Sequence, residues 1–272
     1  MKFKYDYLVK SIDAPIFNKK NIQLFHSDSI QFLRNLKKES IDLVVTDPAY
    51  SGMNQHLKLG KGRIVGKYSD KGDGKNWFEE FHDNPENYRI FLTELHRVLK
   101  ENSHLFIMFD SFSLLTLGPI VREVFNVKNI LTWDKVNIGM GHYFRRQTEF
   151  IIFASKGKKP ISEKSISDIW KIKRIHSAKY PTQKPVELFE AMIYASKPKK
   201  IKSFVVCDPF LGSGSSAIAA INQKVRFVGC DISKTALNVS KKRITGFLDS
   251  GKDNLQPKSQ VDPKLQKIFW KK

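Results

Sequence analysis

Short apolar runs bounded by turn residues alternate with segments whose apolar positions recur at helical spacing. This alternation is typical of a parallel β-sheet covered by helices. The runs predict strands at residues 22–27, 41–46, 103–109, 129–135, 148–154, 203–208 and 225–231. The periodic segments predict helices at about 29–38, 86–100, 114–125, 185–196, 214–223 and 233–247. We therefore expect an α/β fold built on one sheet.

Two long stretches, 51–84 and 156–180, interrupt the pattern. Irregular stretches of this length in a compact domain are usually binding loops or lids. Past residue 248 the chain is polar and loses its periodicity, so we expect one domain at 1–248 and a polar C-terminal tail at 249–272. The alternative is that the apolar residues near the end of the tail dock on the body.

The charge of the chain is unevenly distributed. Lys and Arg number 47 against 27 Asp and Glu, a net charge of +20. Residues 51–75 carry six basic and two acidic side chains, and 156–184 carry nine and two. Basic residues gathered on loops favour a polyanionic partner, because neutralised phosphates release counterions. The alternative is a lysine-rich surface that is simply solvated.

Composition argues against several other classes of protein. The two cysteines, Cys207 and Cys230, end predicted buried strands, which favours free thiols over a disulfide framework. The seven histidines lack paired ligand spacing, so we expect no metal site. No apolar stretch suggests a membrane span or a secretory signal, and we expect a cytoplasmic protein.

The run 41–46 ends in Asp47-Pro48-Ala49-Tyr50. A carboxylate after a buried strand can accept a hydrogen bond from an exocyclic amino group, and an aromatic ring beside it can stack on the planar ring that carries this group. The alternative is an ordinary turn at a strand end, which Asp-Pro often marks.

The run 203–208 leads into Asp208-Pro209-Phe210-Leu211-Gly212-Ser213-Gly214-Ser215 and then a helix. Glycines there let the backbone approach a ligand closely, and the helix start offers unpaired N–H groups. The next strand ends in Asp231, which can accept hydrogen bonds from ribose hydroxyls. Alone, the glycines would equally suit a tight turn.

Together these motifs resemble the two signatures of the amino-methylating DNA methyltransferases, which use S-adenosylmethionine. The acidic motif precedes the glycine motif, an order that marks the beta group of this family. The resemblance covers about residues 20–247. It implies a circularly permuted, Rossmann-like sheet of seven strands, mostly parallel, in which strand 148–154 is antiparallel.

The resemblance also implies residues for the cofactor. Leu24-Phe25-His26-Ser27-Asp28-Ser29 is similar to a segment that places an acid against the adenine of the cofactor. Tyr180-Pro181-Thr182-Gln183-Lys184-Pro185 matches a family box whose lysine could pair with the methionine carboxylate, although Tyr180 replaces the usual histidine. The residues expected to bind the cofactor are Asp28, Asp47, Asp208, Phe210, Gly212, Ser213, Gly214, Ser215, Asp231, Thr182, Gln183 and Lys184.

The expected catalytic residues are Asp47, Pro48 and Tyr50. Asp47 and the Pro48 carbonyl would accept both hydrogens of the target amino group, which makes its nitrogen more nucleophilic and aligns it for transfer. Tyr50 would stack on a base flipped out of the duplex. Ala49 replaces the commoner second proline, a change that keeps the Pro48 carbonyl.

The expected substrate is double-stranded DNA in a bacterium or phage-infected cell. The residues expected to contact it are Lys58, Lys61, Arg63, Tyr143, Phe144, Arg145, Arg146, Lys173 and Arg174. The acidic first residue of the catalytic motif favours the N6 amino group of adenine. The alternatives are the N4 amino group of cytosine, an RNA substrate, or an inactive DNA-binding relative. A homodimer and a partner restriction endonuclease are further alternatives that the family leaves open.

Overall fold

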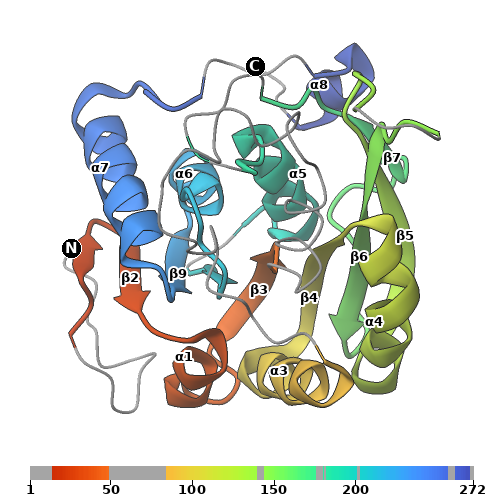
Figure 1. Ribbon diagram of the computed structural model, residues 1–272, viewed down its shortest axis with the longest axis horizontal. Coiled ribbons are helices and arrows are strands. Elements are labelled where there is room, and N and C mark those ends of the chain that lie inside the picture. The colour runs from red at the N-terminus through yellow and green to blue at the C-terminus, as the bar shows by residue number, and fades with distance from the viewer. Residues whose placement is uncertain are drawn as a thin grey trace, which may run out of the picture.

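The computed structural model describes residues 14–48, 84–139, 144–175, 180, 182–200, 203–256 and 261–269. Within these residues one sheet has the strands β1 Phe17–Lys19, β2 Ile22–His26, β3 Ile41–Thr46, β4 Leu99–Phe109, β5 Asn126–Asp134, β6 Thr148–Lys156, β7 Ile169–Lys171, β8 Val205–Asp208 and β9 Arg226–Asp231. The helices are α1 Ser29–Asn35, α3 Pro85–Val98, α4 Ser111–Val124, α5 Val186–Ser196, α6 Ser215–Asn222, α7 Lys234–Ser250 and α8 Pro263–Phe269. Figure 1 shows their arrangement.

The order of strands in the sheet is β1-β2-β9-β8-β3-β4-β6-β5-β7. The neighbours from β2 through β4 are all parallel, and β6 lies antiparallel between β4 and β5. The permuted, mostly parallel α/β fold with an antiparallel strand from residue 148 is therefore confirmed. Strands that are distant in the sequence, such as β3 and β8, lie side by side.

The expected count of seven strands was too low, because the described part of the sheet has nine. The additional strands, β1 and β7, lie at the two edges and have three residues each, too few to show a period. β1 also adds an antiparallel pairing, with β2, to the two that β6 makes with β4 and β5. Because β7 carries the buried Trp170, the stretch 156–180 is not wholly irregular.

Successive side chains along the strands point to opposite faces of the sheet and form an apolar layer on each face. Phe106 and Met108 of β4 belong to the layer under α5, α6 and α7, whereas Leu105 and Ile107 belong to the layer under α1, α3 and α4. The two groups of helices lie on opposite sides of the sheet (Figure 1). This burial of both faces explains why the central strands read as continuous apolar runs.

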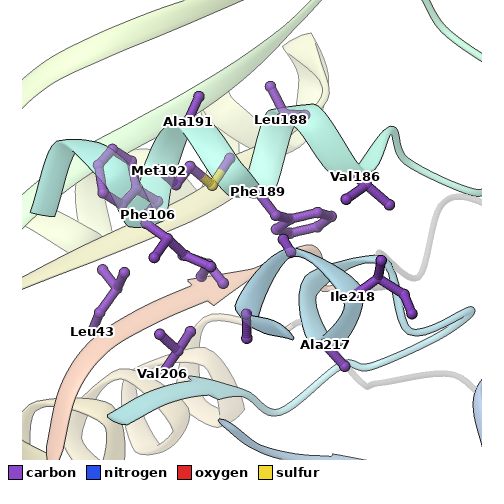
Figure 2. Packing of buried hydrophobic residues seen from close by; sticks show 14 of the residues in the cluster. Leu43, Phe106, Val186, Leu188, Phe189, Ala191, Met192, Val206, Ala217 and Ile218 are labelled. Atoms are coloured by element: carbon purple, nitrogen blue, oxygen red, sulfur yellow. The ribbon is translucent and has the colours of Figure 1, made fainter. Parts of the chain in front are cut away.

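Large side chains fill the first layer, between the sheet and α5. Figure 2 shows Leu43, Phe106 and Val206 of the sheet pointing toward Phe189 and Met192 of α5. All five side chains are buried. Their packing holds α5, and with it the residues that precede this helix, against the sheet.

Polar caps fix where several helices begin. Asp28 accepts hydrogen bonds from the backbone of Ile30 and Gln31 at the start of α1. Asn84 caps α3, which has Pro85 in its first turn. Asp110 caps α4, so this helix begins at Ser111, three residues earlier than the expected start at 114.

The C-terminal segment is partly ordered on the body of the protein. α7 continues to Ser250, and α8 packs against α5. Phe269 is buried, and its ring centroid lies 5.7 Å from that of Trp170 and 5.5 Å from that of Tyr194. The structure thus agrees with the alternative that apolar residues near the end of the tail dock on the body. The helix itself was not predicted, since α8 has only seven residues and buries only Leu265 and Phe269. No helix in the described ranges is long and apolar enough to cross a membrane.

We predict that Phe269→Ala lowers the free energy of unfolding by about 3 kcal/mol, because a buried ring leaves a cavity between two aromatic neighbours. Urea denaturation measures this change. Leu115→Ala removes an exposed side chain of α4 and serves as the control, with an expected change below about 0.5 kcal/mol. Equal effects of the two substitutions would contradict the docking of α8.

Candidate active site

The two motifs found in the sequence meet at the carboxyl edge of the sheet. β3 and β8 are parallel neighbours, with Leu43 opposite Val206 and Val44 opposite Cys207. The Thr46 hydroxyl at the end of β3 donates a hydrogen bond of 3.0 Å to Asp208 Oδ1 at the end of β8. Ligands of open α/β sheets bind at this edge. The acidic turn, which begins at Asp47 after β3, and the glycine turn, residues 209–215 after β8, therefore flank the same site.

Asp208 lies beneath the glycine turn rather than at its surface. Its buried carboxylate accepts hydrogen bonds from Thr46, from the Phe210 backbone and from the Ser216 hydroxyl. Burial raises the pKa of Asp208 to about 7, although these hydrogen bonds oppose the rise. The Asp208 carboxylate thus organises the turn from within. Phe210 packs edge-on against Phe91, with ring centroids 5.4 Å apart.

The glycine turn has a backbone that side chains would disturb. Gly212 and Gly214 have φ angles of +50° and +80°, in the left-handed region. A Cβ atom on Gly214 would lie 3.0 Å from the Cβ of Ser240 on α7. α6 then begins without a side-chain cap, so its first N–H groups face the turn. The turn can therefore cradle an anionic or hydrogen-bonding ligand.

Asp231 contacts the glycine turn, and Asp28 lies at the same edge of the sheet. Asp231 Oδ2 accepts a hydrogen bond of 2.8 Å from the backbone N–H of Gly212, and its Oδ1 accepts one from Ser233. His26 of β2 pairs with Asp231 of β9, which brings the following Asp28 to the same edge. Because Asp28 caps α1 through Oδ1, part of its carboxylate is already engaged.

Lys184 connects the two motifs directly. Its carbonyl accepts a hydrogen bond of 2.7 Å from the Ser215 hydroxyl in the glycine turn. Its ammonium lies 2.5 Å from Asp47 Oδ2 and 3.6 Å from Glu149 Oε2. The sequence suggested that the Lys184 ammonium pairs with a cofactor carboxylate, whereas in the structure it pairs with Asp47 and Glu149.

Burial and neighbouring charges shift the pKa of both members of the Asp47–Lys184 pair. Burial raises the pKa of Asp47, Lys184 opposes that rise, and the negative charge of Glu149 adds to it. Burial lowers the pKa of Lys184, but the two carboxylates outweigh burial and raise it well above its usual value. Lys184 is therefore a stable cation, and Asp47 is a more basic carboxylate than an exposed aspartate.

Arg243 of α7 is a site residue that sequence reasoning missed. Its buried guanidinium donates to the carbonyl of Ser213 at 3.0 Å and to the hydroxyl of Ser215 at 2.9 Å. Its other nitrogens pair with Asp253. Both serines were expected to face the cofactor, but their side chains turn toward Arg243. The available signal was an arginine spaced with Ala236 and Ser240 on the buried face of α7.

The lysine box, the segment 180–185 that contains Lys184, also contacts residues past α7 through Gln183. Gln183 is buried, and its Nε2 donates to the carbonyl of Leu255 at 3.4 Å. Its Oε1 is buried without a hydrogen-bond partner among the described residues. Thr182 is exposed and has a positive φ of 57°. A Cβ atom on Gly212 would lie 3.7 Å from the ring of Tyr180, so the box adjoins the glycine turn.

The residues at 144–146 and 173–174, which were expected to contact DNA, lie at least partly on the surface. Phe144 is fully exposed. Arg145 donates to the carbonyl of Gly139, whereas Arg146 pairs with Asp110 at 3.3 Å and lies over the ring of Phe112. Lys173 and Arg174 follow β7 and are partly exposed. These residues are accessible to a large ligand at the edge of the sheet.

The remaining expected site residues, Tyr50, Lys58, Lys61, Arg63 and Tyr143, lie outside the described residues. Among the described residues, no group of three His, Cys, Asp or Glu side chains could hold a metal ion. The site that can be described therefore consists of carboxylates, one largely buried lysine and a glycine turn.

A permuted α/β sheet whose acidic and glycine turns meet in this way defines the class of amino-directed methyltransferases. Comparisons with known proteins agree with this class. Residues 41–242 match the family model described as DNA methylase. The chain therefore belongs to the DNA methylase family.

Individual relatives match most of the chain. It is 30% identical to the Type II methyltransferase M2.DpnII of Streptococcus pneumoniae, over 89% of this chain and 96% of the relative. It is 31% identical to the Type II methyltransferase M2.LlaDCHI of Lactococcus lactis subsp. cremoris, again over 89% and 96%. The crystal structure of the M1.HpyAVI-SAM complex shares the fold, with a TM-score of 0.56 and 22% identity over 82% of this chain and 99% of that chain.

We predict that Asp208→Asn changes how the stability of the protein depends on pH. The folded Asp208 keeps its proton up to about pH 7, whereas an unfolded aspartate loses it near 3.8. The folded state then binds more protons than the unfolded state, so the wild-type free energy of unfolding falls as the pH rises between these values. Urea denaturation at several pH values should show the wild type losing stability relative to the variant. A constant difference between the two proteins would contradict the raised pKa.

Proposed function

We propose that the protein transfers a methyl group from S-adenosylmethionine to the N6 amino group of an adenine in double-stranded DNA. The observation that carries this proposal is Lys184, which bonds to the glycine turn through its backbone and to Asp47 through its ammonium. A methyl donor on the glycine turn and an amino group at Asp47 would therefore be neighbours. The family of DNA methylases supplies the class of substrate.

Several features of the site fit S-adenosylmethionine. The left-handed glycines and the uncapped start of α6 suit its methionine end, because a carboxylate is stabilised by unpaired N–H groups. Asp231 would hold the ribose hydroxyls, and Asp28 would lie against the adenine. Thr182 and Gln183 would border the methionine moiety, with the Oε1 of Gln183, unpartnered among the described residues, as an available acceptor. When bound, the cofactor supplies an electrophilic methyl carbon on a sulfonium.

The residues of the acidic turn act on the target amino group. Asp47 Oδ2 is held by Lys184, and no described residue donates to Oδ1. Oδ1 would accept one amino hydrogen and the Pro48 carbonyl the other, which directs the nitrogen lone pair toward the methyl carbon. The raised pKa makes Asp47 a stronger acceptor. The base must leave the duplex to reach this position, and Tyr50 would stack on it.

The acidic first residue of the motif favours adenine over cytosine, since serine is commoner there in enzymes that methylate the cytosine N4 amino group. Cytosine N4 is the second candidate target. An RNA substrate and an inactive DNA-binding role are weaker alternatives, because Asp47 and the glycine turn are both intact.

DNA would be held by the basic loops. Among the described residues, Phe144 and Arg145 are exposed and Lys173 and Arg174 partly so, which suits contact with a strand. The relatives named as Type II methyltransferases favour a bacterial cytoplasmic setting with a partner restriction endonuclease. A homodimer is a further proposal from the family resemblance alone.

Transfer of tritium from labelled S-adenosylmethionine tests the function. Duplex DNA, single-stranded RNA and a cofactor-only sample are incubated with the protein, and the labelled base is identified after hydrolysis of the DNA. We expect label in duplex DNA as N6-methyladenine. Label in N4-methylcytosine would show that the target is cytosine and not adenine. Label in RNA alone would refute duplex DNA as the substrate.

We predict that Asp47→Ala lowers the turnover number at least a hundredfold, because the amino group loses its charged acceptor. Binding of S-adenosylmethionine, followed by calorimetry, should change by less than about threefold, since the glycine turn remains. Turnover close to that of the wild type would show that Asp47 does not activate the amino group.

We predict that Gly212→Val, unlike Asp47→Ala, weakens the binding of S-adenosylmethionine. A β-branched residue is strained at a φ of +50°, so the glycine turn cannot keep its shape. We expect cofactor affinity to fall at least tenfold in the same calorimetric experiment. Unchanged affinity would show that the donor does not bind at this turn.

A further inference from the structure

Glu149 is a partly buried acid at the carboxyl edge of the sheet, and the proposed transfer gives it no role. It is the second residue of β6 and lies opposite Trp133 of β5. Because β6 is antiparallel to its neighbour β4, its first residues lie at the edge where the parallel strands end. This reversal of direction brings an acid from the start of a strand to the same edge as Asp47, from the end of β3.

Four charged side chains form a row at this edge. Lys135 lies 3.2 Å from Glu149 Oε1, and Lys184 lies 3.6 Å from Glu149 Oε2. Lys184 in turn lies 2.5 Å from Asp47. The side chains of these residues are 13% to 25% exposed, so their charges are weakly screened by solvent. The row alternates in sign, and Lys184 is shared between two carboxylates.

Resting on the methyltransferase function proposed above, we propose that Glu149 is a positioning residue that shares Lys184 with Asp47 and so sets how strongly Asp47 accepts the amino hydrogens. A cation between two carboxylates neutralises each of them only in part. Without Glu149, the charge of Lys184 would act on Asp47 alone. Asp47 would then be a weaker base and a poorer hydrogen-bond acceptor for the amino group.

The shift in the pKa of Asp47 agrees with this sharing of Lys184. Burial raises it, Lys184 lowers it and Glu149 raises it. Other described acids also lie at this edge: Asp208 on β8, Asp231 on β9, Asp28 after β2, Asp134 at the end of β5 and Asp110 after β4. Each has its own partners: Thr46, Phe210 and Ser216 for Asp208, Gly212 and Ser233 for Asp231, the start of α1 for Asp28, Gln147 and the Val136 backbone for Asp134, and Arg146 for Asp110. Among the described residues, Lys184 forms ion pairs with Asp47 and Glu149.

Glu149→Gln tests this role, because it removes the charge of the side chain and keeps its size. We expect the turnover number at neutral pH to fall about tenfold, as the acceptor at Asp47 weakens. The acidic limb of the pH profile of turnover should move to lower pH, because the group that raised the pKa of Asp47 is gone. The affinities for S-adenosylmethionine and for DNA should change by less than about twofold. A purely structural role would not move the pH profile in this way.

Glu123→Gln is the matched control. Glu123 forms a two-bond ion pair with Arg89 that links α4 to α3, away from the acidic turn, so the same substitution there should leave turnover and its pH profile unchanged. If Glu149→Gln behaves like this control, the proposal is wrong.

Titration of the Asp47 carboxyl carbon by NMR separates this proposal from the proposed function, since it needs no substrate. We expect Glu149→Gln to lower the midpoint of the Asp47 titration and Lys184→Met to raise it. Absence of methyl transfer by the wild type would refute the function, whereas an Asp47 midpoint unmoved by Glu149→Gln would overturn the role of Glu149.

Discussion

The parallel pairing of β3 with β8 is the constraint on which the site depends. Thr46 and Asp208 close this pairing at its carboxyl end with a buried hydrogen bond. The residues are 162 positions apart in the sequence, yet the turns that follow them emerge side by side. A carboxylate that activates an amino group and a turn that holds a methyl donor must be neighbours, because transfer requires an in-line approach over a short distance.

The sequence predicted most of the fold, because buried parallel strands and amphipathic helices leave strong periodic signals. β3 was expected at 41–46 and is found at Ile41–Thr46, and β6 was expected to be antiparallel. The two edge strands β1 and β7 and the helix α8 were missed. They are short, and only contact with the body, such as that of Phe269 with Trp170, gives them their structure.

The candidate site was predictable only in part. Motifs located Asp47, Gly212 and Lys184, because local chemistry at strand ends is visible in the sequence. The pairing of side chains was not predictable. Glu149 lies near the start of β6, and it reaches the carboxyl edge only because β6 is antiparallel to β4. Arg243 comes from α7, whose sequence shows only an amphipathic helix. Such contacts arise from the topology, which places distant residues together. The spacing of Arg243 with Ala236 and Ser240 could indicate that this side chain is buried, but not which residues it contacts.

The clamp formed by Arg243 and Asp253 has a consequence for how this architecture can be altered. Arg243 of α7 donates a hydrogen bond to Ser213 of the glycine turn and pairs with Asp253, just past the end of α7. Gln183 donates a hydrogen bond to Leu255. The residues just after α7, Asp253 and Leu255, are thus a structural part of the glycine-turn side of the candidate site. A chimera that exchanges this segment with a relative must transfer both ends of each of these bonds as one module.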